Sequence, residues 1–239
     1  MYGKSIQKTI SLGHNNLKAS IIIDKVIAFL ILHLPNFNSH LHASAFTELL
    51  EKSINQKLAL FLESQSRGYE FSTGTISPLY FLFIKDTDLN SSRRQPDIGV
   101  FLGSSGVTIN EAFFHIECKR LPTPLKGGRL ESEYARGGNN DGGIERFKKE
   151  LHGASLSVGA MVAYIQKDDY LVWHKRVNGW IKNFMDANPD DNITWSKDDL
   201  LSNSSNNQSE KSSLKIYKSK NSRINYPPII LYHFWIPLS

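Results

Sequence analysis

Two short segments in the middle of the chain most constrain its fold. Residues 112–119 (AFFHIECK) are mostly aromatic or apolar and stop just before Pro122, so they predict a β-strand. Residues 96–102 (PDIGVFL) predict a second strand, and a glycine- and serine-containing turn at 103–106 separates the two. The two segments are therefore expected to pair as a β-hairpin.

Side chains of a strand point alternately to its two faces. Glu117 and Lys119 are therefore expected to share one face, and Cys118 to lie on the other, more apolar face. Pairing of the hairpin would bring Asp97 close to Glu117. Hard cations such as Mg²⁺ take carboxylate, water and phosphate oxygens as ligands, and they lower the pKa of a bound water. These residues predict a metal site that acts on a phosphodiester, with Lys119 orienting the water or stabilising the transition state.

An ordinary hairpin with surface charges is the alternative interpretation, because a loose Asp…Glu-x-Lys pattern arises often by chance. Three features favour the site. Pro96 directly precedes Asp97, Glu117 and Lys119 stand at the polar end of an apolar strand, and a helix–strand pair follows.

The Pro-Asp…Glu-Cys-Lys arrangement resembles the PD-(D/E)xK phosphodiesterase superfamily, whose members have the restriction-endonuclease-like fold. The resemblance covers about residues 46–166. It implies that Asp97 and Glu117 bind Mg²⁺ or Mn²⁺, that the Cys118 backbone carbonyl is an additional ligand, and that Lys119 is the catalytic lysine.

Many members of this superfamily also carry a catalytic glutamate on the first helix of the core. A helix is expected here from residue 44 or 45 to residue 65, with Leu49, Leu50, Ile54, Leu58 and Phe61 on one stripe. Glu48 and Glu51 lie one turn apart on this helix, so both are candidates. Glu48 is slightly preferred, because family members often place this glutamate early in the helix.

The whole chain, 1–239, is expected to form one α/β domain with a restriction-endonuclease-like mixed central sheet flanked by helices. Residues 46–166 would form the core, residues 1–45 a helical extension and residues 167–239 a C-terminal β extension. Beyond the hairpin the pattern predicts a helix over 144–152, a strand over 159–165, a helix around 177–184, an edge strand over 214–220 and a strand over 229–236.

The apolar run 21–34 is interpreted as a buried helix that ends at Pro35, followed by a connection. It contains Asp24 and Lys25 and falls short of the roughly 20 residues that a membrane span needs. The single cysteine, Cys118, excludes an internal disulfide and favours a reducing compartment. No membrane association and a cytoplasmic location are therefore expected.

A formal charge of +5 favours a polyanionic partner. Five basic residues around the site are predicted to contact nucleic-acid phosphates, namely Arg93, Arg94, Arg146, Lys148 and Lys149. For Arg93 and Arg94 a solvated loop is an equally good interpretation. The succession from Tyr134 through Gly143, Arg146 and Phe147 to the strand at 159–165 resembles nuclease-like proteins of bacterial mobile elements and phage defence.

The sequence therefore predicts a Mg²⁺- or Mn²⁺-dependent endonuclease that acts on DNA rather than RNA, and the family resemblance alone implies a role in bacterial antiviral defence. Cutting both strands of a duplex requires two sites, which favours a homodimer. Two alternatives remain open. One is a catalytically silent nucleic-acid-binding or scaffold subunit of a larger complex with a helicase or ATPase partner chain. The other is an effector that senses a small ligand or a partner protein.

Overall fold

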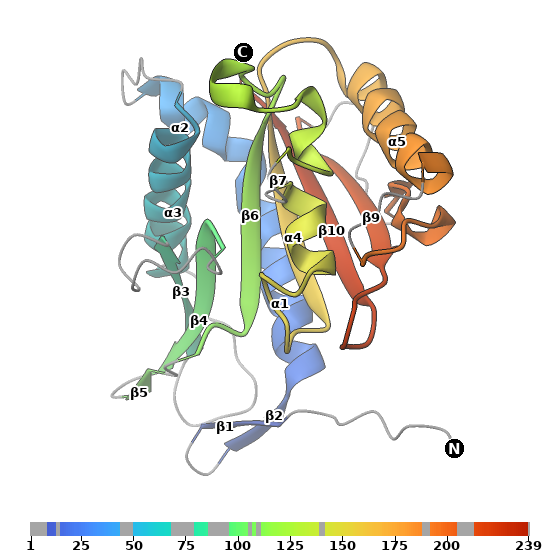
Figure 1. The fold of residues 1–239 in the computed structure, drawn as a ribbon. Helices are drawn as coiled ribbons and strands as arrows, with labels where there is room; N and C mark the ends of the chain where they lie inside the picture. The colour runs from blue at the N-terminus through green and yellow to red at the C-terminus, as the bar shows by residue number, and fades with distance from the viewer. Residues whose placement is uncertain are drawn as a thin grey trace, which may run out of the picture.

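One large mixed β-sheet forms the centre of the protein. The computed structural model describes residues 9–12, 15–43, 50–67, 79–85, 96–104, 107–108, 111–138, 142–187, 192–204 and 213–238. The strand order of the sheet is β3-β4-β6-β7-β10-β9-β8, with β5 paired to β4 (Figure 1). The strands are β3 (Leu79–Lys85), β4 (Ile98–Ser104), β5 (Val107–Thr108), β6 (Phe114–Leu121), β7 (Val158–Ile165), β8 (Ser202–Asn203), β9 (Lys215–Asn221) and β10 (Ile229–Pro237). A separate hairpin is formed by β1 (Thr9–Leu12) and β2 (Asn15–Lys18).

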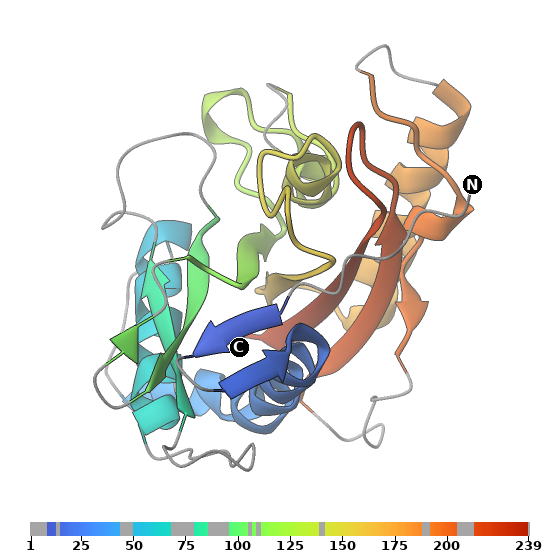
Figure 2. The same cartoon turned by 90° about the horizontal axis from the view of Figure 1, so that it is seen from below.

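Helices cover both faces of this sheet. They are α1 (Ala19–His33), α2 (Phe37–Ala43), α3 (Glu51–Arg67), α4 (Gly143–Lys148) and α5 (Tyr170–Ala187), with short 3-10 helices η1 (Leu34–Asn36), η3 (Lys126–Gly128), η4 (Glu131–Tyr134) and η5 (Lys197–Asp199). Figure 2 shows α1 on one side of the sheet and α4 and α5 on the other. The predicted α/β class, with a mixed sheet flanked by helices, is confirmed.

The predicted hairpin is present, and β4 and β6 are antiparallel with Ile98 opposite Ile116. The chain reverses at the predicted turn, because β5 pairs with the end of β4 and Ser104 lies opposite Val107; residues 105–106 lie outside the described part. Alternation along β6 is as predicted. Cys118 is buried in the hydrophobic cluster that contains α1 and α3 residues, whereas Glu117 and Lys119 point to the opposite face.

The N-terminal helical segment is longer than expected. α1 ends at His33, but a 3-10 turn and then α2 follow where a connection was predicted. Pro35 occupies the first turn of η1, where its missing N–H group breaks no hydrogen bond, and the Phe37 ring lies 5.6 Å from that of Phe61. The helical run Ser20–His42 is long and apolar enough to cross a membrane by length and composition. This is weak evidence for a span, because Val26 and Phe29 are buried against the sheet.

In α3, Ile54, Leu58 and Phe61 are buried, as the predicted stripe requires. Leu50 is 58% exposed, so its placement on that stripe was wrong. It precedes the first residue of α3, so the 3.6-residue periodicity that places Ile54, Leu58 and Phe61 on the buried face does not apply to it. Leu49 lies outside the described residues.

The C-terminal segment extends the same sheet, as predicted. β10 lies between β7, to which it is parallel, and β9, to which it is antiparallel. β9 is not the edge strand that was predicted, because β8 pairs with its outer side. The helix expected over 144–152 is shorter, since α4 ends at Lys148.

Candidate functional site

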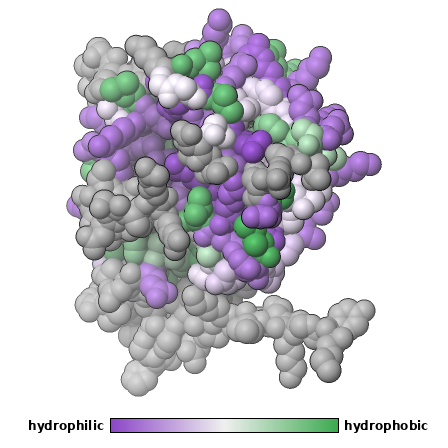
Figure 3. Space-filling view, viewed as in Figure 1, coloured by the Kyte–Doolittle hydropathy of each residue, from purple (hydrophilic) through white to green (hydrophobic). Residues whose placement is uncertain are grey.

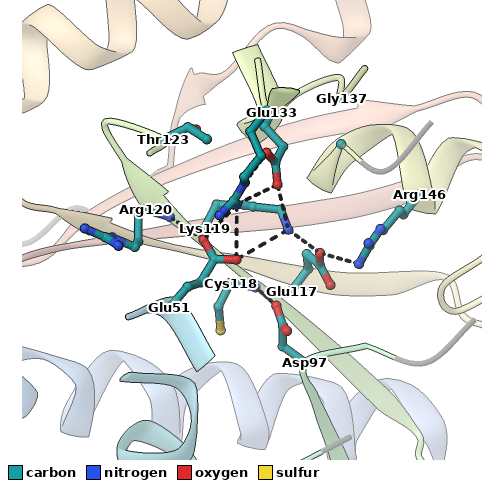
Figure 4. A network of polar contacts seen from close by, with 12 residues as sticks. Glu51, Asp97, Glu117, Cys118, Lys119, Arg120, Thr123, Glu133, Gly137 and Arg146 are labelled. Atoms are coloured by element: carbon teal, nitrogen blue, oxygen red, sulfur yellow. Dashed lines mark hydrogen bonds and ion pairs between the residues drawn. The ribbon is translucent and has the colours of Figure 1, made fainter. Parts of the chain in front are cut away.

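The hairpin brings Asp97, Glu117 and Lys119 together on one side of the sheet (Figure 4). Asp97 stands just before β4, and its Oδ2 accepts a hydrogen bond of 2.8 Å from the backbone N–H of Cys118 in β6. On β6, the Lys119 Nζ lies 2.9 Å from Oε1 of Glu117. The Cys118 thiol points to the opposite face, where burial and the neighbouring Asp97 raise its pKa. The predicted role of the Cys118 carbonyl as a metal ligand stays a prediction.

The first helix of the core contributes Glu51 to this cluster. Its Oε1 lies 3.9 Å from the Lys119 Nζ, and its Oε2 accepts a hydrogen bond of 3.2 Å from the backbone N–H of Arg120. α3 begins at Glu51, so the side chain projects from the first turn of the helix towards the C-terminal end of β6. Glu48, the slightly preferred candidate, lies outside the described residues.

A fourth carboxylate, Glu133, was not predicted from the sequence. It lies in η4, and its Oε1 is 3.8 Å from the Lys119 Nζ. Arg129 holds it in place, with its Nε 2.5 Å from Oε2 of Glu133 and its Nη2 3.3 Å from Oε2 of Glu51. The four-residue spacing of Arg129 and Glu133 is the one signal in the sequence that could have indicated this pair. Their approach to Lys119 depends on the irregular segment after Pro122, which no periodic pattern describes.

Glu117 has two further partners on the side facing α4. The Nη1 of Arg146 lies 3.0 Å from Oε1 of Glu117, and the Nδ1 of His152 lies 3.2 Å from Oε2. Arg146 is thus next to the predicted catalytic residues, as expected, although its partner here is a carboxylate. His152 was not singled out from the sequence, because a lone histidine after a short helix carries no distinctive spacing.

Burial and charge set the protonation of this cluster. Burial and the nearby Glu117 raise the pKa of Asp97 to about 8, although Lys119 acts in the opposite direction. Burial would also raise the pKa of Glu117, but Lys119, His152 and Arg146 outweigh it and hold that pKa well below its usual range. Burial would lower the pKa of Lys119, but Glu117, Glu51 and Asp97 outweigh it and raise that pKa. Glu117 and Lys119 are therefore both charged at neutral pH.

The other predicted phosphate contacts lie elsewhere. Lys148 is fully buried and its Nζ lies 2.6 Å from Oδ1 of Asp199, so the prediction that it contacts nucleic acid was wrong for this structure. On the short helix α4 its side chain points between the helix and the C-terminal segment. Lys149 is 12% exposed and pairs with Glu145 at 3.0 Å. Arg93 and Arg94 lie outside the described residues.

The donor set has the chemistry that a hard cation requires. Glu51, Asp97 and Glu117 supply carboxylate oxygens, and the repulsion of Asp97 by Glu117 and Glu51 is the kind of interaction that a cation between them relieves. Within the described ranges, no group of three or more His, Cys, Asp or Glu side chains stands ready in metal-binding geometry. Both oxygens of Glu117 are instead close to basic side chains. The residues fit Mg²⁺ or Mn²⁺ by chemistry. Oε1 of Glu117 already has two cationic partners, whereas its Oε2 has no hydrogen-bond partner among the described residues.

No protein-family model, curated protein or solved structure gives a significant match to this chain. The interpretation of the site therefore rests on its residues and their geometry.

Proposed function

We propose that the protein is a metal-dependent endonuclease that hydrolyses phosphodiester bonds, with DNA as the preferred substrate over RNA. The observation that carries the proposal is the convergence of Asp97, Glu117 and Lys119 at the junction of β4 and β6, with Glu51 beside them. The element order α3, β3, β4, β6, α4, β7, with β6 and β7 parallel, agrees with what a restriction-endonuclease-like core would need.

Asp97 and Glu117 would hold Mg²⁺ or Mn²⁺, together with the Cys118 carbonyl. A cation held there supplies charge neutralisation at the phosphate and a bound water of lowered pKa. The remaining roles, which are to position the water and to stabilise charge on the phosphate, fall to side chains of the protein. The Lys119 ammonium, charged and 5% exposed, is placed to hold the attacking water or to offset negative charge that develops on the phosphate. Glu51 and Glu133 also lie close to the Lys119 ammonium and help to hold its orientation.

The surface around the site is largely polar. Figure 3 shows mostly hydrophilic residues among the coloured part of the face that carries α4 and β6. Together with the formal charge of +5, this favours binding through phosphate contacts. By the family resemblance, the setting is a bacterial cytoplasm and the role is defence against phage or mobile elements. A second copy of the chain, or a helicase or ATPase chain, is the expected partner.

The second candidate is a nucleic-acid-binding or scaffold subunit without turnover. One observation favours it, namely that Lys119 and Arg146 already neutralise Glu117. A protein of this kind would bind nucleic acid equally well with and without a divalent cation.

A cleavage panel separates the two candidates. The protein is incubated with supercoiled plasmid, linear duplex, single-stranded DNA and RNA, each in Mg²⁺, Mn²⁺ or EDTA. The nuclease proposal expects cleavage of DNA in Mg²⁺ or Mn²⁺ and none in EDTA. Binding without cleavage under every condition would favour the silent subunit.

A further inference from the structure

Glu117 has two cationic partners at its Oε1, whereas its Oε2 has no hydrogen-bond partner among the described residues. Its Oε1 lies 2.9 Å from the Lys119 Nζ and 3.0 Å from the Arg146 Nη1, and its Oε2 lies 3.2 Å from the His152 Nδ1. The carboxylate itself is completely buried. A cation that binds Glu117 through Oε1 must therefore displace Lys119 or Arg146.

The exposure of the two Oε1 partners indicates which one leaves. The side chain of Lys119 is 5% exposed, whereas that of Arg146 is 26% exposed. Moving Lys119 would take a polar group through packed protein, which is costly. The Arg146 guanidinium can turn to solvent and stay hydrated.

The helix that carries Arg146 is fixed, so only the side chain has to move. Glu145 is fully buried and accepts hydrogen bonds of 3.1 Å from the Gly137 N–H and 3.2 Å from the Gly142 N–H. Gly143 packs so closely that a Cβ there would lie 2.3 Å from Cε of Met161. The backbone of Arg146 therefore stays beside β6 while the guanidinium of its side chain changes partner.

A guanidinium released beside a metal-bound phosphodiester has one obvious acceptor, because it matches phosphate oxygens in charge and geometry. We propose that Arg146 is a displaceable counter-ion of Glu117, which leaves the carboxylate when a divalent cation binds and then contacts a phosphate of the nucleic acid. This inference rests on the proposed function. It predicts that metal and nucleic acid bind with positive coupling, because the ion frees the residue that holds the phosphate.

The first test measures Mn²⁺ binding by calorimetry without nucleic acid, in wild type and in Arg146→Gln. The matched control is Arg176→Gln. Arg176 lies on α5, away from the site, and its Nη1 also pairs with a carboxylate, since it lies 2.9 Å from Oδ2 of Asp168. Circular dichroism melting checks that each variant is folded. Removing the competing cation should tighten Mn²⁺ binding about tenfold, which corresponds to about 1.4 kcal/mol. The control should match wild type.

The second test measures the affinity for a labelled DNA duplex by anisotropy, with Ca²⁺ and with EDTA. Wild type and Arg176→Gln should bind more tightly in Ca²⁺, and Arg146→Gln should lose most of that gain. Mn²⁺ affinity that stays equal or falls in Arg146→Gln would overturn the inference while leaving the proposed function standing. Absence of saturable Mn²⁺ binding in wild type would overturn both.

Discussion

The buried pair of Lys148 and Asp199 should be essential for stability and irrelevant to nucleic-acid binding. Both side chains are fully buried, and the Lys148 Nζ lies 2.6 Å from Oδ1 of Asp199. The same Nζ donates to Oγ of Ser222 at 3.2 Å and lies 4.9 Å from the centre of the Trp195 ring. The pair thus joins α4, which carries Arg146, to the C-terminal segment.

The substitution Lys148→Met keeps most of the volume and removes the charge. It leaves the Asp199 carboxylate buried, with the Ser196 backbone N–H as a remaining donor. Breaking a buried pair from one side costs about 3–5 kcal/mol, because the remaining charge has no adequate partner. With a urea dependence of about 2–3 kcal/mol per molar, the unfolding midpoint should fall by about 1–2 M.

Urea unfolding followed by tryptophan fluorescence measures this effect, with Lys182→Met as the control because Lys182 is exposed on α5. The double variant Lys148→Met/Asp199→Leu should recover most of the loss, since apolar replacement of both partners is often close to neutral. DNA affinity of folded Lys148→Met should equal that of wild type. A midpoint shift below about 0.3 M, or a selective loss of DNA binding, would refute the assignment of Lys148 to the interior.

Three further predictions concern the site and the pH dependence of stability. Lys119→Ala should abolish cleavage and leave DNA affinity within about threefold of wild type, measured by gel assay and by anisotropy; equal loss of both would argue against a catalytic lysine. Glu51→Gln should lower the cleavage rate and raise the Mn²⁺ concentration needed for half-maximal rate. The same dependence of rate on Mn²⁺ in variant and wild type would show that Glu51 has no role in the site. Burial and the nearby His174 lower the pKa of His233 to about 3, below the unfolded value of about 6.5. Its stabilising contribution is therefore complete above pH 6.5 and falls as the pH drops towards 3. Between pH 7 and pH 5 the urea midpoint of unfolding should fall less in His233→Gln than in wild type. An equal fall in the two proteins would contradict this.

The hairpin could be predicted from the sequence because its evidence is local. Two-residue periodicity places Cys118 on the apolar face, and Glu117 with Lys119 on the other. The pairing of β4 with β6 then brings Asp97 to the backbone of Cys118. These relations involve neighbouring strands and need no knowledge of the remaining fold.

The surroundings of Lys119 could not be predicted in the same way. Glu133 reaches it through the segment after Pro122, whose conformation follows from tertiary contacts and not from periodicity. Lys148 and Arg146 are two residues apart on a helix of six residues, too short for a clear apolar stripe to show which one faces inward. The position of β10 beside β7 depends on pairing across a long sequence separation, with Ile230 opposite Val158.

The most direct test of the account compares DNA cleavage by wild type and Asp97→Asn in Mg²⁺. Asparagine has nearly the same shape, and its amide oxygen can still accept the hydrogen bond from the Cys118 N–H, so the fold should be retained and melting curves should agree. We expect wild type to cut DNA only when the divalent cation is present, and Asp97→Asn to cut at least about a hundredfold more slowly, a loss of about 2.7 kcal/mol in transition-state stabilisation. Equal cleavage by the two proteins, or cleavage by wild type in EDTA, would contradict a metal-dependent nuclease site at Asp97, Glu117 and Lys119.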